Sequence, residues 1–311
     1  MNEPNHRIMS VVKQAVELGP VQETLLIPLV SRAEETKKAN GLVNDPRAVE
    51  IVESLDYDFD KWTKYPTLLA GACVRTRMFD IVAERFLAMY PTGTVIEIGC
   101  GLNTRFERID NGEARWFDLD LPDSIALRRH YFEDVERRTM LVGSVVDEEW
   151  LEPVADTGGP YLFLSEAVLV YLKEAEVRKA ITQIAARCPH AWLVTDLAAS
   201  KLTTPEYAAK SRKRIGISAW FNWGCDDPSA IESWLPGIKL LSADSFGDAP
   251  DSIVERMPTM YRILTRYARW LVRLMTKHYL IAHYRLGGAA DTTGPNSRSK
   301  PNRPRLDSPQ Q

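Results

Sequence analysis

The sequence predicts an α/β fold in which parallel strands alternate with crossover helices. From Thr94 onward, short apolar segments rich in β-branched and aromatic residues alternate with stretches of helical spacing, and a glycine-rich turn follows the first segment. Before Thr94 the chain shows helical spacing, proline and glycine punctuation and little β-branched clustering. We therefore expect an N-terminal helical cap over residues 1–92, packed on an α/β core over residues 93–290.

The expected strands, in chain order, are residues 94–98, 114–119, 138–142, 160–165, 190–196, 237–242 and 278–286. In the cap, residues 75–90 have the apolar spacing of one buried helix face. Pro122 suits the first turn of the helix after the second strand, because its missing N–H needs no partner there. The clearest helix ends before Cys188, with apolar residues at positions 177, 180, 181, 184 and 185.

Three further segments complete the organisation. An insertion over residues 197–234 separates the fifth and sixth strands, and a basic helical stretch around residues 261–275 precedes the last strand. The tail over residues 291–311 has four prolines and one large apolar residue, Leu306. Such a tail cannot bury enough surface to offset its ordering entropy, so we expect it to be disordered.

Composition narrows the classes of function. A chain of 311 residues allows one domain or two, and 45% hydrophobic with 26% charged residues is ordinary for a soluble globular protein. Its 39 Lys and Arg stand against 42 Asp and Glu, a formal net charge of -3. The protein therefore has no global basic field, and we expect neither a nucleic-acid nor a membrane partner.

Cysteine usage and the absence of targeting signals indicate a compartment. The four cysteines are far apart and form neither a CxxC pair nor a Cys/His cluster at zinc spacing, so we expect reduced thiols and no metal site. The N-terminus lacks the apolar region of a secretory signal. The densest apolar run, residues 161–172, is too short to span a bilayer and contains Glu166. These features predict a soluble cytoplasmic protein.

The glycine-rich turn has the pattern GxGxxT. Gly99 permits a tight turn, and Gly101 lets the backbone approach a ligand, although the same glycines could serve strand-to-helix packing alone. Two acids at the end of the second strand, Asp118 and Asp120, follow Gly99 by 19 and 21 residues. This spacing matches a carboxylate that hydrogen-bonds a ribose diol.

Ribose recognition is shared by nicotinamide enzymes and by methyltransferases that use S-adenosylmethionine. The loop ends in Thr104 rather than in the third small residue that a pyrophosphate favours. Glu97, just before the loop, would repel a pyrophosphate but suits the cationic methionine end of S-adenosylmethionine. Charge therefore favours S-adenosylmethionine, and an NAD-dependent oxidoreductase is the alternative of another class.

Several motifs occur in an order typical of one family: GCGLNTRFERID, RWFDLDLP, SVVDEEW and YLFLSEAVLVYL, with ETLLIPL at residues 23–29 and FNWGCDDP at residues 221–228. With them the chain resembles the leucine carboxyl methyltransferase superfamily, in particular its bacterial tetracenomycin polyketide O-methyltransferase type, over most of residues 20–288. Asn103 stands where an aspartate is common in the family's GLDTR loop. The resemblance implies a class I methyltransferase fold, with seven strands and helices on both faces, the last strand antiparallel beside the fifth.

The resemblance also implies a cofactor site. Arg77, with Arg75 as the fallback, would bind the cofactor carboxylate, and either could instead form a surface salt bridge. Asp120 would hold the ribose hydroxyls, with Asp118 as the alternative. Glu166 would meet the ammonium group, unless it only forms a structural ion pair with Arg105 or Arg77. Ser144 and Val145 would contact the adenine, although a plain strand-end turn explains Val145 equally well.

The chemistry needs few protein groups. Methyl transfer from sulfonium is an in-line displacement without a covalent nucleophile, and the sequence shows no convincing triad, so no catalytic side chain is identified. The five histidines lie outside the cofactor motifs. A carboxylate acceptor, with a pKa of about 4, needs no general base, whereas a phenol or alcohol does. Trp220, Phe221 and Trp223 offer surface for a flat acceptor, or belong to the core.

We therefore expect an S-adenosylmethionine-dependent O-methyltransferase that acts on a small-molecule carboxylate, such as a polyketide-like or aromatic acid, and gives a methyl ester. O-methylation of a phenol or hydroxyl on a natural product is the alternative within the class. A binding module that kept the fold without turnover is a further alternative. The sequence predicts no oligomeric state.

Overall fold

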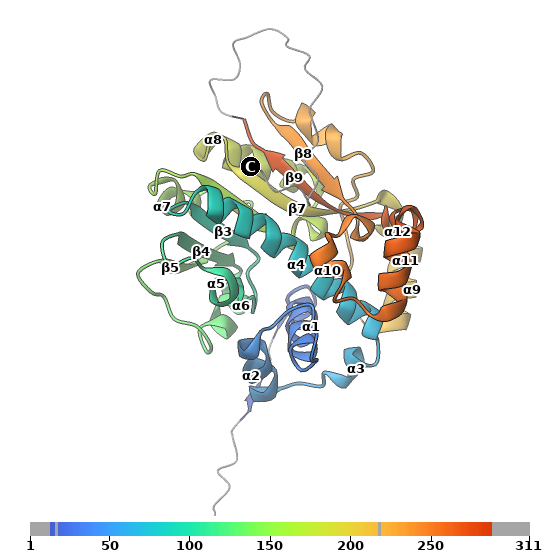
Figure 1. Cartoon of the computed structure of the whole chain (residues 1–311). Coiled ribbons are helices and arrows are strands. Elements are labelled where there is room, and N and C mark those ends of the chain that lie inside the picture. The colour runs from blue at the N-terminus through green and yellow to red at the C-terminus, as the bar shows by residue number, and fades with distance from the viewer. Residues whose placement is uncertain (1–12, 16–17, 217–218, 288–311) are drawn as a thin grey trace, which may run out of the picture.

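The computed structural model describes residues 13–15, 18–216 and 219–287 (Figure 1); the expected disordered tail lies outside them. The centre of the protein is a seven-stranded sheet in the order β5-β4-β3-β6-β7-β9-β8. The strands are β3 (Thr94–Ile98), β4 (Arg115–Asp120), β5 (Arg138–Val142), β6 (Tyr161–Ser165), β7 (Trp192–Ala198), β8 (Lys239–Asp244) and β9 (Tyr279–Arg285). The first five are parallel, and β9 pairs antiparallel with both β7 and β8. This confirms the expected fold class.

The central strands are apolar because both faces of a parallel sheet are covered. Every residue of β3 and of β6 is buried. The fifth strand, β7, begins two residues later than expected. The reason is local, since His190 adopts a positive φ of 63°, a turn conformation that cannot continue a strand.

Helices cover the two faces of the sheet. On one face, α4 (Pro66–Met89) packs Phe79 and Phe86 against Val95 of β3. On the other, α7 (Leu151–Ala155) and α8 (Glu174–Arg187) pack against Ile96 and its neighbours. Helix α8 buries the five residues that its spacing predicted: Val177, Ala180, Ile181, Ile184 and Ala185. The helix α6 (Pro122–Arg128) begins at Pro122, also as predicted.

The N-terminal helices meet the carboxyl ends of the strands. They comprise η1 (Gln22–Leu25), α1 (Leu26–Thr36), α2 (Pro46–Ser54) and α3 (Asp60–Thr63), with the short strands β1 (Gln14–Ala15) and β2 (Leu55–Asp56). Their apolar cluster includes Leu102 of the glycine loop and Leu127 of α6. The described part of residues 18–63 therefore forms one wall at this edge of the sheet.

The segments after β7 lie beside this edge, and those around α9 and η5 contribute a second wall. They are η3 (Ser200–Leu202), α9 (Pro205–Ile215), η4 (Pro228–Ser233), η5 (Phe246–Asp248), α10 (Asp251–Val254), α11 (Thr259–Tyr267) and α12 (Arg269–Thr276). The basic stretch expected to be helical is thus two helices, which meet at Ala268. Within the described part of the chain, no helix is both long and apolar enough to cross a membrane.

Candidate active site

A cavity of about 490 Å³ opens at the carboxyl ends of β3, β4 and β6. This is the point where the chain, having laid β4 beside one edge of β3, later places β6 beside the other. Ligands of open α/β sheets bind at such a switch point. The volume falls within the range of about 300–1,000 Å³ that is usual for small-molecule sites.

The glycine loop forms the floor of this cavity. Gly99 and Gly101 have φ values of 66° and 45°, a region that disfavours side chains. A Cβ on Gly99 would lie 2.3 Å from Cγ2 of Val168, and one on Gly101 would lie 3.0 Å from Cβ of Leu25. Both glycines line the cavity. The loop can pack this closely against Val168 and Leu25 only because neither position has a side chain.

The two candidate ribose acids have different surroundings. Asp120 lines the cavity and accepts hydrogen bonds from the backbone N–H groups of Gly101 and Leu121, each at 2.7 Å. Asp118 does not line the cavity; it is 1% exposed and pairs with Arg128 at 2.6 Å. Arg128 also donates to the backbone oxygen of Gly101 at 3.0 Å. Asp118 therefore anchors the glycine loop through Arg128, while Asp120 faces the cavity.

Ser144 and Val145, at the end of β5, also line the cavity. Val145 is 6% exposed and belongs to the core beneath the sheet. The backbone N–H of Ser144 is held by the side chain of Asp147 at 3.1 Å, which fixes the turn. These two residues thus lie on the same wall as Asp120.

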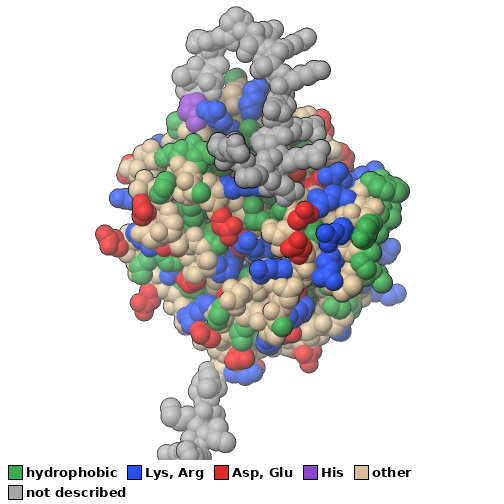
Figure 2. Space-filling view, in the orientation of Figure 1, with side chains coloured by type: hydrophobic (Ala, Val, Ile, Leu, Met, Phe, Trp, Pro, Cys, Tyr) green, Lys and Arg blue, Asp and Glu red, His purple; other side chains and the backbone are tan. Residues whose placement is uncertain are grey.

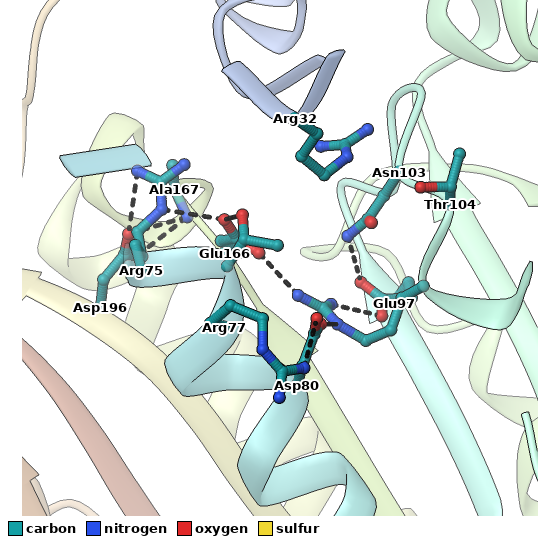
Figure 3. Close-up of polar contacts among 12 residues, drawn as sticks. Arg32, Arg75, Arg77, Asp80, Glu97, Asn103, Thr104, Glu166, Ala167 and Asp196 are labelled. Atoms are coloured by element: carbon teal, nitrogen blue, oxygen red, sulfur yellow. Dashed lines mark hydrogen bonds and ion pairs between the residues drawn. The ribbon is translucent and has the colours of Figure 1, made fainter. Parts of the chain in front are cut away.

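A buried network of charges forms the wall between the glycine loop and α4 (Figure 3). Arg105, from α5 (Arg105–Ile109), is 1% exposed and donates to carboxylates from three elements. It contacts Asp80 of α4 at 2.7 Å, Glu97 of β3, and Glu166 after β6 at 2.7 Å. Glu97 and Glu166 line the cavity, and Arg105 does not. Arg105 therefore holds both acids from behind.

The two arginines of α4 that the sequence offered, Arg77 and Arg75, lie in different places. Arg77 is outside the 490 Å³ cavity and bonds Asp80 and Glu84, both at 3.1 Å, beside a smaller cavity of about 200 Å³. Arg75 lines the main cavity and pairs with Glu166 at 3.0 Å. Two residues along a helix are turned by about 200°, so only one of the two can face the site.

Two cavity-wall residues, Arg32 and Tyr279, and the buried Asp196 behind the wall have no counterpart among the residues chosen from the sequence. Arg32 of α1 is 2% exposed, bonds Asp45 at 2.8 Å and reaches the cavity. Tyr279 of β9 lines the cavity and donates its hydroxyl hydrogen to Asp196, at the C-terminal part of β7. Asp196 also accepts the N–H of Ala167, whose φ is 57°, and so fixes the turn that carries Glu166. Their chain positions carry no local signal; only the fold brings them together.

Burial sets the pKa directions of most acids at or behind this wall. Burial raises the pKa of Glu97, of Asp120 and of Asp196, although nearby donors oppose the shift. Glu166 is the exception: burial pushes its pKa up, but Arg75 and Arg105 outweigh this and hold it at about 2. Carboxylates outnumber guanidinium groups by one in the connected network, which comprises Asp45, Asp80, Glu84, Glu97, Glu166 and Asp196 against Arg32, Arg75, Arg77, Arg105 and Arg108.

The other half of the cavity is aromatic. Its lining aromatic residues are Tyr171, Trp220, Phe221, Phe246 and Tyr279. Trp220 and Phe221 stack with their ring centroids 5.0 Å apart, and Phe221 lies 5.6 Å from Tyr171 and 6.2 Å from Tyr279. Trp223 does not belong here; it is 4% exposed and packs on Trp234 within the core, the alternative that its position left open. None of the histidines in the described ranges lines the cavity.

A sheet with this strand order and a glycine loop followed by an acidic strand end define a class I S-adenosylmethionine-dependent methyltransferase. The chain belongs to the leucine carboxyl methyltransferase family, whose sequence model matches residues 26–185. The cofactor is therefore S-adenosyl-L-methionine, and the oxidoreductase alternative is set aside.

Individual relatives agree with this membership. The chain is 30% identical to the tetracenomycin polyketide synthesis O-methyltransferase TcmP of Streptomyces glaucescens, over 76% of this chain and 87% of that protein. It is 29% identical to the S-adenosyl-L-methionine-dependent methyltransferase dpfgK of Gibberella zeae, over 73% and 83%. A crystal structure of a DUF574 family protein from Streptomyces avermitilis has the same fold, with a TM-score of 0.51, 9% identity and coverage of 89% and 99%.

Proposed function

We propose that this methyltransferase acts on the carboxylate of a small aromatic or polyketide-like acid and gives a methyl ester. The observation that carries the proposal is that one cavity has a charged half and an aromatic half. Among the described side chains that line this cavity, none is a free base. An apolar, flat acceptor suits the rings of Tyr171, Trp220 and Phe221. The name of the Streptomyces glaucescens relative, a polyketide synthesis O-methyltransferase, supports the same acceptor class and transfer to oxygen.

In the charged half we propose Arg75, in place of Arg77, as the partner of the cofactor carboxylate, because its guanidinium faces the cavity. Glu166 would receive the ammonium group while it keeps its pair with Arg105. Asp120 would accept the ribose hydroxyls with lone pairs that its two backbone donors leave free.

The remaining cofactor contacts follow from position. Ser144 and Val145 would border the adenine, and Gly99 and Gly101 would underlie the methionine part and the ribose. Glu97, which pairs with Arg105, adds a carboxylate to the wall, and the excess of carboxylates there suits a ligand with a positive sulfur.

Bound S-adenosylmethionine supplies an electrophilic methyl group. The protein's part is to hold the acceptor oxygen in line with that group and to exclude water from the cavity. The aromatic rings orient the acceptor, and the N-terminal helices cover the strand ends. No proton must be moved for a carboxylate acceptor, which is ionised at neutral pH.

The candidate bases on the cavity wall are engaged. Tyr279 donates to Asp196, and burial together with that carboxylate raises its pKa well above the ordinary value, so it does not supply a phenolate. The low pKa of Glu166, about 2, makes it a weak base. These properties favour an acceptor that arrives already ionised.

The test uses S-adenosylmethionine labelled in its methyl group with matched acceptors that differ only in an aromatic carboxyl or a phenolic hydroxyl. We expect label to pass to the acid and to be released as methanol by mild base. A base-stable product from the phenol would replace the proposal with hydroxyl methylation. Binding of S-adenosylhomocysteine without turnover across a broad panel of acids and phenols would instead indicate a binding module.

A further inference from the structure

Helices α11 and α12 expose an unusual number of large apolar side chains on one side of the molecule. We name this side the α11–α12 surface; its apolar members, with their exposed fractions, are Met260 (79%), Ile263 (53%), Tyr267 (81%), Trp270 (68%), Leu274 (51%) and Met275 (65%). Each helix buries one residue, Thr265 in α11 and Val272 in α12, so both helices pack on the protein through another face. A contiguous apolar patch of this kind marks an interaction site.

The charged residues of the chain segment that forms this surface have one sign. Residues 256–290 contain no Asp or Glu, whereas their basic residues are Arg256, Arg262, Arg266, Arg269, Arg273, Lys277 and Arg285. Arg269 and Arg273 are paired with acids of neighbouring segments, Asp251 and Asp248. Arg266 and Lys277 are exposed and have no carboxylate within 4.0 Å among the described residues. In Figure 2, green side chains gather on the edge that carries α11 and α12 in Figure 1, with blue side chains beside them.

Exposed apolar side chains beside basic residues indicate which kind of partner binds the α11–α12 surface. A second copy of the chain would bring one basic surface against another, which costs energy. A protein partner needs a pocket for its anchoring side chains, and neither of the two cavities described above takes a residue from α11 or α12. A bilayer needs no pocket. Helices with Lys and Arg beside Trp, Leu and other apolar residues lie in the interface of anionic membranes, and Trp and Tyr favour that depth.

We propose that the α11–α12 surface binds the surface of an anionic lipid bilayer, with Tyr267 and Trp270 at headgroup level and Arg266 and Lys277 at the lipid charges. The net charge of -3, from which the sequence analysis expected no membrane partner, is an average that hides this local basic segment. Neither helix would cross the bilayer, because α11 has nine residues and α12 has eight. Both would lie in the plane of the membrane–water interface.

The α11–α12 surface is connected to the aromatic half of the active-site cavity through contacts between α12 and η5. The backbone N–H of Gly247 in η5 donates to Thr276 of α12 at 3.3 Å, and Arg273 pairs with Asp248 of η5 at 2.6 Å. Phe246, beside these two residues, and Tyr279, just after α12, both line the cavity. Membrane attachment would thus place this half of the cavity near the bilayer. The proposal stands independently of the acceptor.

The experiment is co-sedimentation of the full chain with vesicles of phosphatidylcholine alone or mixed with phosphatidylglycerol, at low and high salt. We expect binding only to the mixed vesicles, weakened by salt. A basic residue near an anionic surface contributes about 1 kcal/mol, so the double variant Arg266→Gln with Lys277→Gln should lower the partition coefficient by about tenfold or more. Trp270→Ser should lower it severalfold without changing its salt dependence.

The matched controls are Arg178→Gln with Lys179→Gln on the exposed side of α8, and Met89→Ser at the end of α4. Both should leave vesicle binding unchanged. Absence of binding to mixed vesicles, or an equal loss in the controls, would overturn the proposal. So would sedimentation velocity that shows a dimer dissociated by Trp270→Ser in a chain without vesicle affinity, because a second copy would then cover the surface. Salt-sensitive DNA binding that ignores Trp270→Ser, without vesicle binding, would likewise assign the surface to polyanions.

Discussion

Replacement of Arg75 by methionine tests the proposed cofactor contacts most directly. The Arg75 guanidinium faces the cavity and is held by Glu166 at 3.0 Å and by the hydroxyl of Tyr279 at 3.2 Å, so its direction is fixed before any ligand arrives. Hydrogen bonds to a charged group contribute about 1.5–3 kcal/mol. Arg75→Met should therefore weaken S-adenosylhomocysteine binding by roughly 10- to 150-fold in calorimetric titration. The matched change Arg77→Met should alter it by less than about threefold, because Arg77 lies outside the cavity and bonds Asp80 and Glu84.

A second ligand separates this role from general damage to the site. Loss of Arg75 also leaves Glu166 with one guanidinium partner fewer, and the melting temperature should fall for that reason. Methylthioadenosine has the nucleoside and the sulfur of the cofactor but no amino-acid group. Its affinity should change little in Arg75→Met. Equal losses for both ligands, or a larger loss in Arg77→Met, would refute the assignment of Arg75 to the carboxylate.

Three other substitutions or pairs test the remaining assignments. Asp120→Asn should weaken both S-adenosylhomocysteine and methylthioadenosine by about tenfold or more, whereas Asp118→Asn should mainly lower the free energy of unfolding, by about 3–5 kcal/mol, because it breaks a buried ion pair; the reverse pattern in titration and urea unfolding would exchange their roles. Glu166, with a folded pKa of about 2, stabilises the fold above its unfolded pKa of about 4.3, and this contribution is lost as pH falls from about 5 to 2. Stability in Glu166→Gln should therefore depend less on pH in that window, and an unchanged acid unfolding curve would contradict the shift. Trp220→Ala should raise the KM for the acceptor while Trp223→Phe changes stability instead, and a KM effect confined to Trp223→Phe would place the acceptor elsewhere.

The sheet was predictable because its signals are local. A strand buried on both faces must be apolar throughout, as β3 and β6 are, and a proline at position 122 or a positive φ at His190 acts within a few residues. The glycine loop and Asp120 were found for the same reason, since spacing along a βαβ unit fixes which strand ends meet.

The cavity wall was only partly predictable because helix rotation and long-range packing decide it. Arg75 and Arg77 are chemically the same in sequence, and only the packing of α4 against the sheet turns one inward. Arg32 lies more than sixty residues before the glycine loop, and Tyr279 reaches Asp196 only through strand pairing of β9 with β7. Trp220 and Trp223 lie in an irregular segment, where no periodicity separates a cavity face from a core face.

The position of Arg105 explains how a site with surplus buried acid can remain ordered. A buried ion pair adds little net stability compared with an apolar core, and an uncompensated buried carboxylate is costly. Arg105 binds one carboxylate each from α4, β3 and the turn after β6, and it does so without touching the cavity. Arg105 itself stays outside the cavity, whereas Arg75 lines it and also pairs with Glu166. We propose that this wall favours a cationic ligand, such as a sulfonium with an ammonium group, over a pyrophosphate, which would meet the carboxylates of Glu97 and Glu166.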